Sequence, residues 1–264
     1  MSEILHPRPA ATVLALRDGD AGYEVLMLRR NLQSDFVGGA YVFPGGGVDD
    51  TDAGDDLQRL VFGIDDVEAS NRLGLESGGL AYYVACLREL FEEAGLLIVC
   101  DENGETVDVV DGAVVQRLAA HRRSINGATM SFLEMLQQED LVLDLRDLAY
   151  LANWVTPEGA PRRYDTRFFV ALAPTGQIAA HDAGETIEDH WLRPRDALAA
   201  FERDEFTMIL PTIRNLQAVA DFETASDVLA YANSLSDIPR IEPRFETREN
   251  NVVIVLPDGE EFGT

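Results

Sequence analysis

LRELFEEAGL, residues 87–96, closes a segment whose apolar residues repeat with the period of an α-helix, over 80–94. At ~100° per residue from Arg88, three glutamates fall at about 40°, 100° and 140°: Glu92, Glu89 and Glu93. The apolar residues fall between about −40° and −160°: Val84, Phe91, Leu80, Leu87, Tyr83 and Leu90. The stretch therefore predicts a helix with one carboxylate face and one apolar face.

The charges on the carboxylate face destabilise the predicted helix. Glu89 and Glu93 are like charges at i, i+4, a spacing that costs a few tenths of a kcal/mol. All three glutamates precede Gly95, the residue predicted to end the helix, where the helix dipole favours cations. A charged face exposed to solvent is the simpler interpretation, but a hard divalent cation held by carboxylate oxygens would resolve the conflict.

The same stretch resembles the second half of the Nudix box, G-x5-E-x7-R-E-U-x-E-E-x-G-U, where U is aliphatic. Every fixed position of that half is matched: Arg88, Glu89, Leu90, Glu92, Glu93, Gly95 and Leu96. FPGGGVD, residues 43–49, resembles the glycine-rich first half. About thirty extra residues, 50–79, separate the halves, and Leu80 stands where the first glutamate would fall. Asp49 or Asp50 could stand in for it.

One branch of the Nudix family carries such an insertion and includes the peroxisomal coenzyme A diphosphatases. This chain resembles that branch from about residue 8 to residue 220, through RPAATV (8–13), GAYVFPGG (39–46), WVTP (154–157) and RYDTRFF (163–169). The coenzyme A signature of related Nudix enzymes is matched only in part, by LMLRR (26–30) and the glycine-rich segment.

The resemblance implies an α/β/α sandwich with a mixed β-sheet and a metal-dependent hydrolase that cleaves a diphosphate linkage. It implies that Glu89, Glu92 and Glu93 hold Mg²⁺ or Mn²⁺, while Arg88 orients the glutamates. Nudix enzymes often draw a further carboxylate, ligand or base, from the region of residues 181–192. Glu185 and Glu188 are both candidates here.

Candidate phosphate-binding groups flank the predicted strands. Consecutive glycines allow close approach of backbone N–H groups to a phosphate, although a glycine run is more often only a turn: Gly45, Gly46 and Gly47. Arg29 lies at the end of a strand predicted over 23–29. Arg163 and Arg167 lie at even spacing about the strand 164–172, so they share a face and could clamp phosphates. Solvated arginines and surface salt bridges are the alternatives.

Composition excludes several functions. The net charge is −26, and all 21 basic residues are arginine. Bulk electrostatics therefore argues against nucleic-acid binding, and the absence of lysine excludes a Schiff-base mechanism. Neither a signal peptide nor an apolar run near 18 residues is present, so we expect a cytoplasmic protein that does not cross a membrane.

The organisation we predict is one Nudix domain over residues 1–239 and a tail over 240–264. Within the domain, we expect the insertion at about 50–79 to be a lid or spacer. A helical excursion at about 111–138 would shape the pocket for the distal half of the substrate. The tail reads as a β-hairpin, which could pair with a partner subunit in a homodimer or fold back on its own chain.

Three functions remain open at this point. The first is hydrolysis of coenzyme A or an acyl-CoA at its diphosphate, and the second is hydrolysis of ADP-ribose or a nucleotide sugar. The third is a non-catalytic Nudix-fold sensor that binds a nucleotide and signals through the tail. Turnover of coenzyme A, dephospho-coenzyme A and ADP-ribose separates the first two, and loss of the box glutamates would mark the third.

Overall fold

The strands assemble around one mixed sheet in the computed structural model, which describes residues 5–33, 37–248 and 251–263. Its central order is β10-β2-β1-β9-β8-β11, with β3 beside β2 and β4 beside β1. β1 runs parallel to β9, whereas it pairs antiparallel with β2 and β4. The strands are β1 (Arg8–Gly19), β2 (Gly22–Arg30), β3 (Tyr41–Val42), β4 (Gly45–Gly47), β8 (Leu148–Val155), β9 (Tyr164–Leu172), β10 (Thr186–Leu192) and β11 (Arg240–Ile241).

Alternation along the strands divides the core between the two faces of the sheet. In β1, Val13 and Ala15 belong to one apolar cluster, and Leu14 and Leu16 belong to the other. Successive side chains of a strand point to opposite faces, so a continuous apolar run predicts a sheet covered on both sides.

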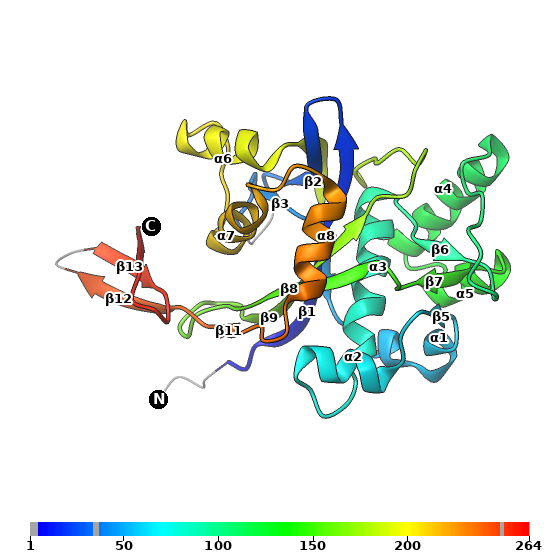
Figure 1. Ribbon diagram of the computed structural model, residues 1–264, viewed down its shortest axis with the longest axis horizontal. Helices are drawn as coiled ribbons and strands as arrows, with labels where there is room; N and C mark the ends of the chain where they lie inside the picture. Colours follow the sequence, from blue (N-terminus) through cyan, green and yellow to red (C-terminus); the bar gives the residue numbers. More distant parts are fainter. Residues whose placement is uncertain (1–4, 34–36, 249–250, 264) are drawn as a thin grey trace.

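Helices cover both faces (Figure 1). The first cluster packs under α2 (Asp66–Leu73), α3 (Leu80–Ala94), α4 (Gly112–Asn126) and α5 (Phe132–Gln138). The second packs under α6 (Pro194–Glu202), α7 (Leu210–Val219) and α8 (Ala225–Ser234). The predicted α/β/α sandwich with a mixed sheet is confirmed. Within the described residues, no helix is long and apolar enough to cross a membrane.

The segment 50–79 packs against α3 and hydrogen-bonds its first residues. It contains η1 (Asp50–Ala53), α1 (Asp55–Gln58), β5 (Val61–Phe62) and α2. β5 joins a small sheet with β7 (Val142–Asp144) and β6 (Val99–Cys100). The Asp66 carboxylate of α2 accepts hydrogen bonds from the backbone N–H groups of Gly78 and Leu80. It therefore satisfies donors at the start of α3 that the helix itself leaves unpaired.

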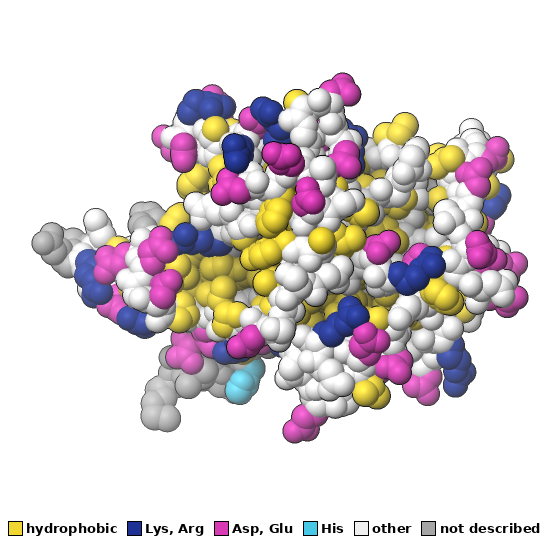
Figure 2. All heavy atoms as spheres, in the orientation of Figure 1, with side chains coloured by type: hydrophobic (Ala, Val, Ile, Leu, Met, Phe, Trp, Pro, Cys, Tyr) yellow, Lys and Arg dark blue, Asp and Glu magenta, His cyan; other side chains and the backbone are white. Residues whose placement is uncertain are grey.

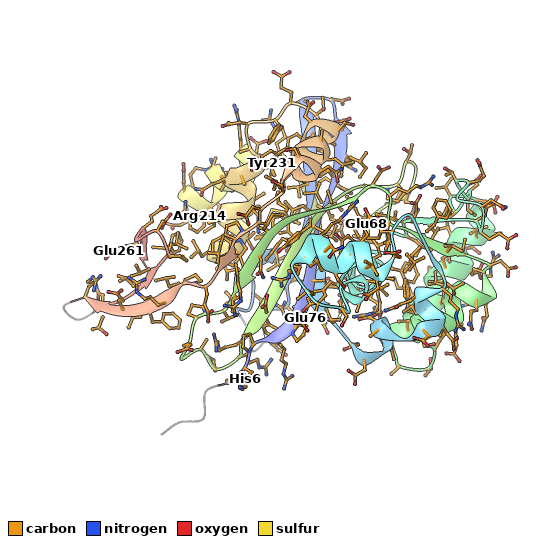
Figure 3. All side chains as sticks on the ribbon, turned by 60° about the horizontal axis from the view of Figure 1, so that its bottom comes forward. His6, Glu68, Glu76, Arg214, Tyr231 and Glu261 are labelled. Atoms are coloured by element: carbon orange, nitrogen blue, oxygen red, sulfur yellow. The ribbon has the colours of Figure 1, made fainter. Side chains whose placement is uncertain are left out.

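The tail forms a three-stranded antiparallel sheet where the sequence predicts a hairpin. Its strands are β12 (Arg244–Arg248), β13 (Asn251–Val255) and β14 (Glu261–Gly263); positions 249, 250 and 264 of the predicted tail lie outside the described residues. Before it, β11 pairs in parallel with β8 of the main sheet. Figure 3 shows Arg214 of α7 near this sheet, where it forms an ion pair with Glu260. The tail thus folds back on its own chain.

Candidate active site

α3 carries the glutamates to the edge of a cavity. The helix ends at Gly95, which adopts the left-handed conformation (φ 71°) and donates its N–H to the Phe91 carbonyl at 2.9 Å. Glycine takes this conformation without the Cβ penalty of other residues. The end of the helix is fixed by its contacts with α4: the Arg122 Nε and Asn126 Nδ2 atoms both donate to the Glu92 carbonyl, at 2.9 and 3.1 Å.

Arg88 is the centre of a buried ion-pair network. Its Nε and Nη2 atoms donate to the two Asp52 carboxylate oxygens at 2.8 and 3.0 Å. Nη1 donates to Glu89 at 2.8 Å and reaches Glu92 at 3.5 Å, while Nη2 also donates to the Gly47 carbonyl at 2.9 Å. Burial opposes the charge of Arg88, but its hydrogen bonds to Asp52 and the nearby glutamates outweigh this and raise its pKa. This geometry suits a residue that orients Glu89.

Asp52 is the acidic residue that the sequence interpretation missed. Its side chain is fully buried, whereas that of Asp49 is 68% exposed and 3.8 Å from Arg88. Asp50 is exposed and forms no contact with Arg88 among the ion pairs of the described residues. Asp52 lies six residues after Gly46, where the G-x5-E spacing of the Nudix box places the first glutamate. This spacing could have identified Asp52 from the sequence. The extra residues therefore lie inside the x7 segment of the box, after its first acid.

The glycine-rich strand holds the glutamates from the other side. The Gly45 N–H donates to a Glu93 oxygen at 3.0 Å, and a Cβ on Gly46 would lie 2.5 Å from Glu89 Oε1. A Cβ on Gly45 would lie 2.5 Å from the Ala11 carbonyl oxygen, so β4 can approach β1 only without a side chain there. All three glycines line the cavity, but the Gly45 N–H is committed to Glu93.

Burial raises the pKa values of all three glutamates. Desolvation raises the pKa of Glu89 to about 7, with the attraction of Arg88 working in the opposite direction. Burial and the charge of Glu89 raise the pKa of Glu93 well above its usual range. Burial also raises the pKa of Glu92. Carboxylates with strongly raised pKa values at a cavity wall are typical of functional sites. A cation bound beside them would lower these pKa values and return the carboxylates to the charged form.

A divalent ion fits this donor set. Glu89, Glu92 and Glu93 all line the same cavity and offer hard oxygen ligands. Among the described residues, no three acidic, histidine or cysteine side chains converge closely enough to enclose an ion by themselves. Mg²⁺ commonly takes one or two carboxylates and completes its shell with water and substrate phosphates. The residues present therefore suit an ion that is held jointly with an anionic substrate.

We expect Glu89→Gln to stabilise the metal-free protein at pH 8. A folded-state pKa of about 7 against an ordinary value of 4.5 means that the unfolded chain ionises first as pH rises. The wild type then loses up to about 3 kcal/mol between pH 4.5 and 7, a loss that the glutamine variant avoids. Urea unfolding in EDTA at pH 4 and pH 8 measures this difference. Equal stabilities of variant and wild type at pH 8 would contradict the account.

The cavity has a volume of about 1410 Å³. Glu185 lines it, and its charge contributes to the raised pKa of Glu89 and Glu93. The Asp182 carboxylate accepts hydrogen bonds from the backbone N–H groups of Glu185 and Thr186, at 3.0 and 2.9 Å, and so fixes the loop that presents Glu185. Ile125 and Asn126, the last residues of α4 within the predicted helical excursion, also line the cavity.

Glu188, the other candidate, lies outside the cavity lining. Its carboxylate pairs with Arg29 at 2.9 Å and with His190 at 3.0 Å. These hydrogen bonds, first from His190 and then from Arg29, lower its pKa. Of the two glutamates, the geometry therefore favours Glu185.

The predicted substrate arginines lie outside the cavity lining and form ion pairs within the protein. Arg29 is engaged by Glu188, Arg163 by Glu242 and the Thr156 carbonyl, and Arg167 by Asp165. With these partners and outside the cavity lining, the three arginines are less well placed to reach a bound phosphate than the sequence predicts. Successive side chains of a strand point to opposite faces, so Arg30 of β2 faces away from Arg29. Arg30 and Arg162 line the cavity instead.

The fold and the site together define a Nudix hydrolase, a diphosphate-cleaving enzyme. Residues 58–219 match the family described as the NUDT19 Nudix domain, and the chain belongs to that family. The acyl-coenzyme A diphosphatase NUDT19 of Xenopus laevis is 26% identical over 91% of this chain and 72% of its own length. The human protein of that name is 25% identical over 90% and 72%. A solved NUDIX hydrolase from Alicyclobacillus acidocaldarius superposes with a TM-score of 0.68 and 29% identity, covering 89% of this chain and 99% of its own.

Proposed function

We propose that this chain hydrolyses the diphosphate of coenzyme A or an acyl-CoA, using Mg²⁺ or Mn²⁺ held by Glu89, Glu92 and Glu93. The observation that carries the proposal is the cavity, which is lined by these carboxylates together with apolar side chains such as Trp154 and Met208. Its volume of about 1410 Å³ exceeds the roughly 300–1,000 Å³ usual for drug-sized ligands. The names of the relatives support the same substrate class.

In the proposed reaction, water attacks one phosphorus and the P–O bond to the bridging oxygen breaks. The products are 4′-phosphopantetheine, or its acyl thioester, and adenosine 3′,5′-bisphosphate. A bound divalent ion would offset the diphosphate charge and lower the pKa of a water. Glu185 lies at the cavity wall, where it can accept the proton that this water loses. Arg88 holds Glu89 in place through its hydrogen bond of 2.8 Å.

The substrate test compares coenzyme A, dephospho-coenzyme A and ADP-ribose in the presence of Mg²⁺ or Mn²⁺, with product identification by mass spectrometry. We expect coenzyme A to be cleaved with the highest kcat/KM and to yield adenosine 3′,5′-bisphosphate. Preference for ADP-ribose would reject this substrate and favour the alternative diphosphatase. Binding of these ligands without any turnover would instead favour a sensor.

Arg162 is the cavity arginine that we expect to contact the 3′-phosphate. It is exposed and lines the cavity beside Tyr164. Arg162→Gln should lower kcat/KM for coenzyme A by roughly tenfold and for dephospho-coenzyme A by much less, because only the former carries that phosphate. Arg203→Gln is the matched control, since Arg203 pairs with Glu205 outside the cavity lining. An equal loss for both substrates would contradict the assignment.

A further inference from the structure

Apart from the carboxylates of α3, the same cavity is lined by a group of large apolar side chains. These apolar side chains come from β8, the segment before α7, and the tail: Trp154, Met208, Pro243, Phe245, Ile254 and Phe262. Figure 2 shows hydrophobic side chains gathered between the tail sheet and the main body. The tail sheet therefore supplies a wall of the same cavity that contains the proposed active site.

Three of these side chains form a row across the tail sheet. Phe245 of β12 pairs in register with Ile254 of β13, which pairs with Phe262 of β14. Residues directly opposite in antiparallel strands share a face, so the three side chains present one apolar surface. Ile254 and Phe262 also pack against the apolar core beneath α7 and α8.

The row is fixed in position relative to the main sheet. β11 pairs with β8 of that sheet immediately before the tail, and Arg214 of α7 pairs with Glu260. Phe245 reaches the loop between β8 and β9, where a Cβ on Gly159 would lie 3.9 Å from its ring. Even so, Phe245 remains 42% exposed, one of the large apolar side chains that the fold leaves uncovered. An apolar ligand would cover it favourably.

We propose that the row Phe245–Ile254–Phe262, with Trp154 and Met208, binds the acyl chain of a thioester substrate whose diphosphate lies at Glu89, Glu92 and Glu93. The assignment rests on the proposed function and makes the tail a specificity element. An alkyl chain needs no polar partner, whereas the ring nitrogens of adenine lose hydrogen bonds to water on burial. Of the five side chains, Trp154 alone carries an N–H or O–H donor, so the surface suits the alkyl chain better.

The test measures binding of dodecanoyl-pantetheine and of pantetheine to the full-length protein by calorimetry. Both probes lack the diphosphate, so binding does not depend on hydrolysis. We expect the wild type to bind the dodecanoyl probe at least roughly tenfold more tightly than pantetheine. Phe245→Ser should remove most of that difference, and Phe262→Ser provides a second variant if the first does not fold. Ile178→Ser is the control, because Ile178 is 87% exposed and lies outside the cavity lining.

Equal affinity of the wild type for both probes would overturn the proposal, as would an undiminished difference in folded Phe245→Ser and Phe262→Ser. Weaker binding of adenosine 3′,5′-bisphosphate to Phe245→Ser, with the dodecanoyl preference intact, would assign the row to adenine instead. If the wild type prefers the dodecanoyl probe but cleaves no coenzyme A ester, the proposed function fails and the acyl site stands.

Discussion

Glu92→Gln is expected to reduce metal-dependent diphosphate hydrolysis by at least roughly a hundredfold, the scale reached when a group that stabilises transition-state charge is removed. Glutamine keeps the shape of the side chain but is a poor ligand for a hard cation. The fold should survive, because the Glu92 side chain is 24% exposed and reaches Arg88 only at 3.5 Å. Initial rates with saturating Mg²⁺, together with circular dichroism, measure both outcomes.

Glu188→Gln is the matched control for that variant. The sequence offers Glu188 as an alternative to Glu185 for the further carboxylate, but Glu188 pairs with Arg29 outside the cavity lining. Its replacement should therefore leave the rate within a few-fold of wild type. Unchanged turnover in Glu92→Gln, or a similar loss in both variants, would show that the carboxylate face of α3 is not the catalytic metal site.

Asp52→Ala is expected to cost about 3–5 kcal/mol of unfolding free energy. Asp52 is fully buried and bonds Arg88 through both oxygens, so its loss leaves a buried guanidinium short of its charge partner. Since Arg88 also holds Glu89, metal affinity or activity should fall by a further ~10–100-fold. Urea denaturation and Mn²⁺ titration measure the two effects separately.

Asp49→Ala tests whether burial of Asp52 is the reason for the large loss of stability expected in Asp52→Ala. Asp49 is also near Arg88, at 3.8 Å, but its side chain is 68% exposed. An exposed pair of this kind contributes about 0–1 kcal/mol, so the variant should remain close to wild type in stability. A comparable loss in both variants would mean that the ion pair with Asp52 is not the main support of Arg88.

The periodicity of apolar residues predicted α3 well, but it did not predict α2. Residues 80–94 form one helix because the apolar stripe and Gly95 indicate the same element. α2 was not predicted, although Asp65 caps it through the Glu68 N–H and Gly74 ends it in the left-handed conformation. These capping residues were readable signals that the acidic composition of the insertion obscured.

Long-range partners could not be predicted in the same way. Periodicity placed Arg163 and Arg167 on one face of β9 but could not say which face meets the cavity. The same ambiguity applies to the doublet Arg29-Arg30, where only Arg30 lines the cavity. The partnership of Asp52 with Arg88 spans 36 residues and depends on how the insertion folds. The third strand of the tail likewise depends on pairing with β13.

The crowded carboxylates of α3 are expected to hold a divalent ion together with a diphosphate. Crystals grown with Mn²⁺ and imidodiphosphate, a slowly hydrolysed diphosphate analogue, test it through the anomalous scattering of manganese. We expect an anomalous peak within coordination distance of oxygens from Glu89, Glu92 or Glu93 and from the analogue. Ordered water alone beside these side chains, with manganese elsewhere or absent, would contradict it.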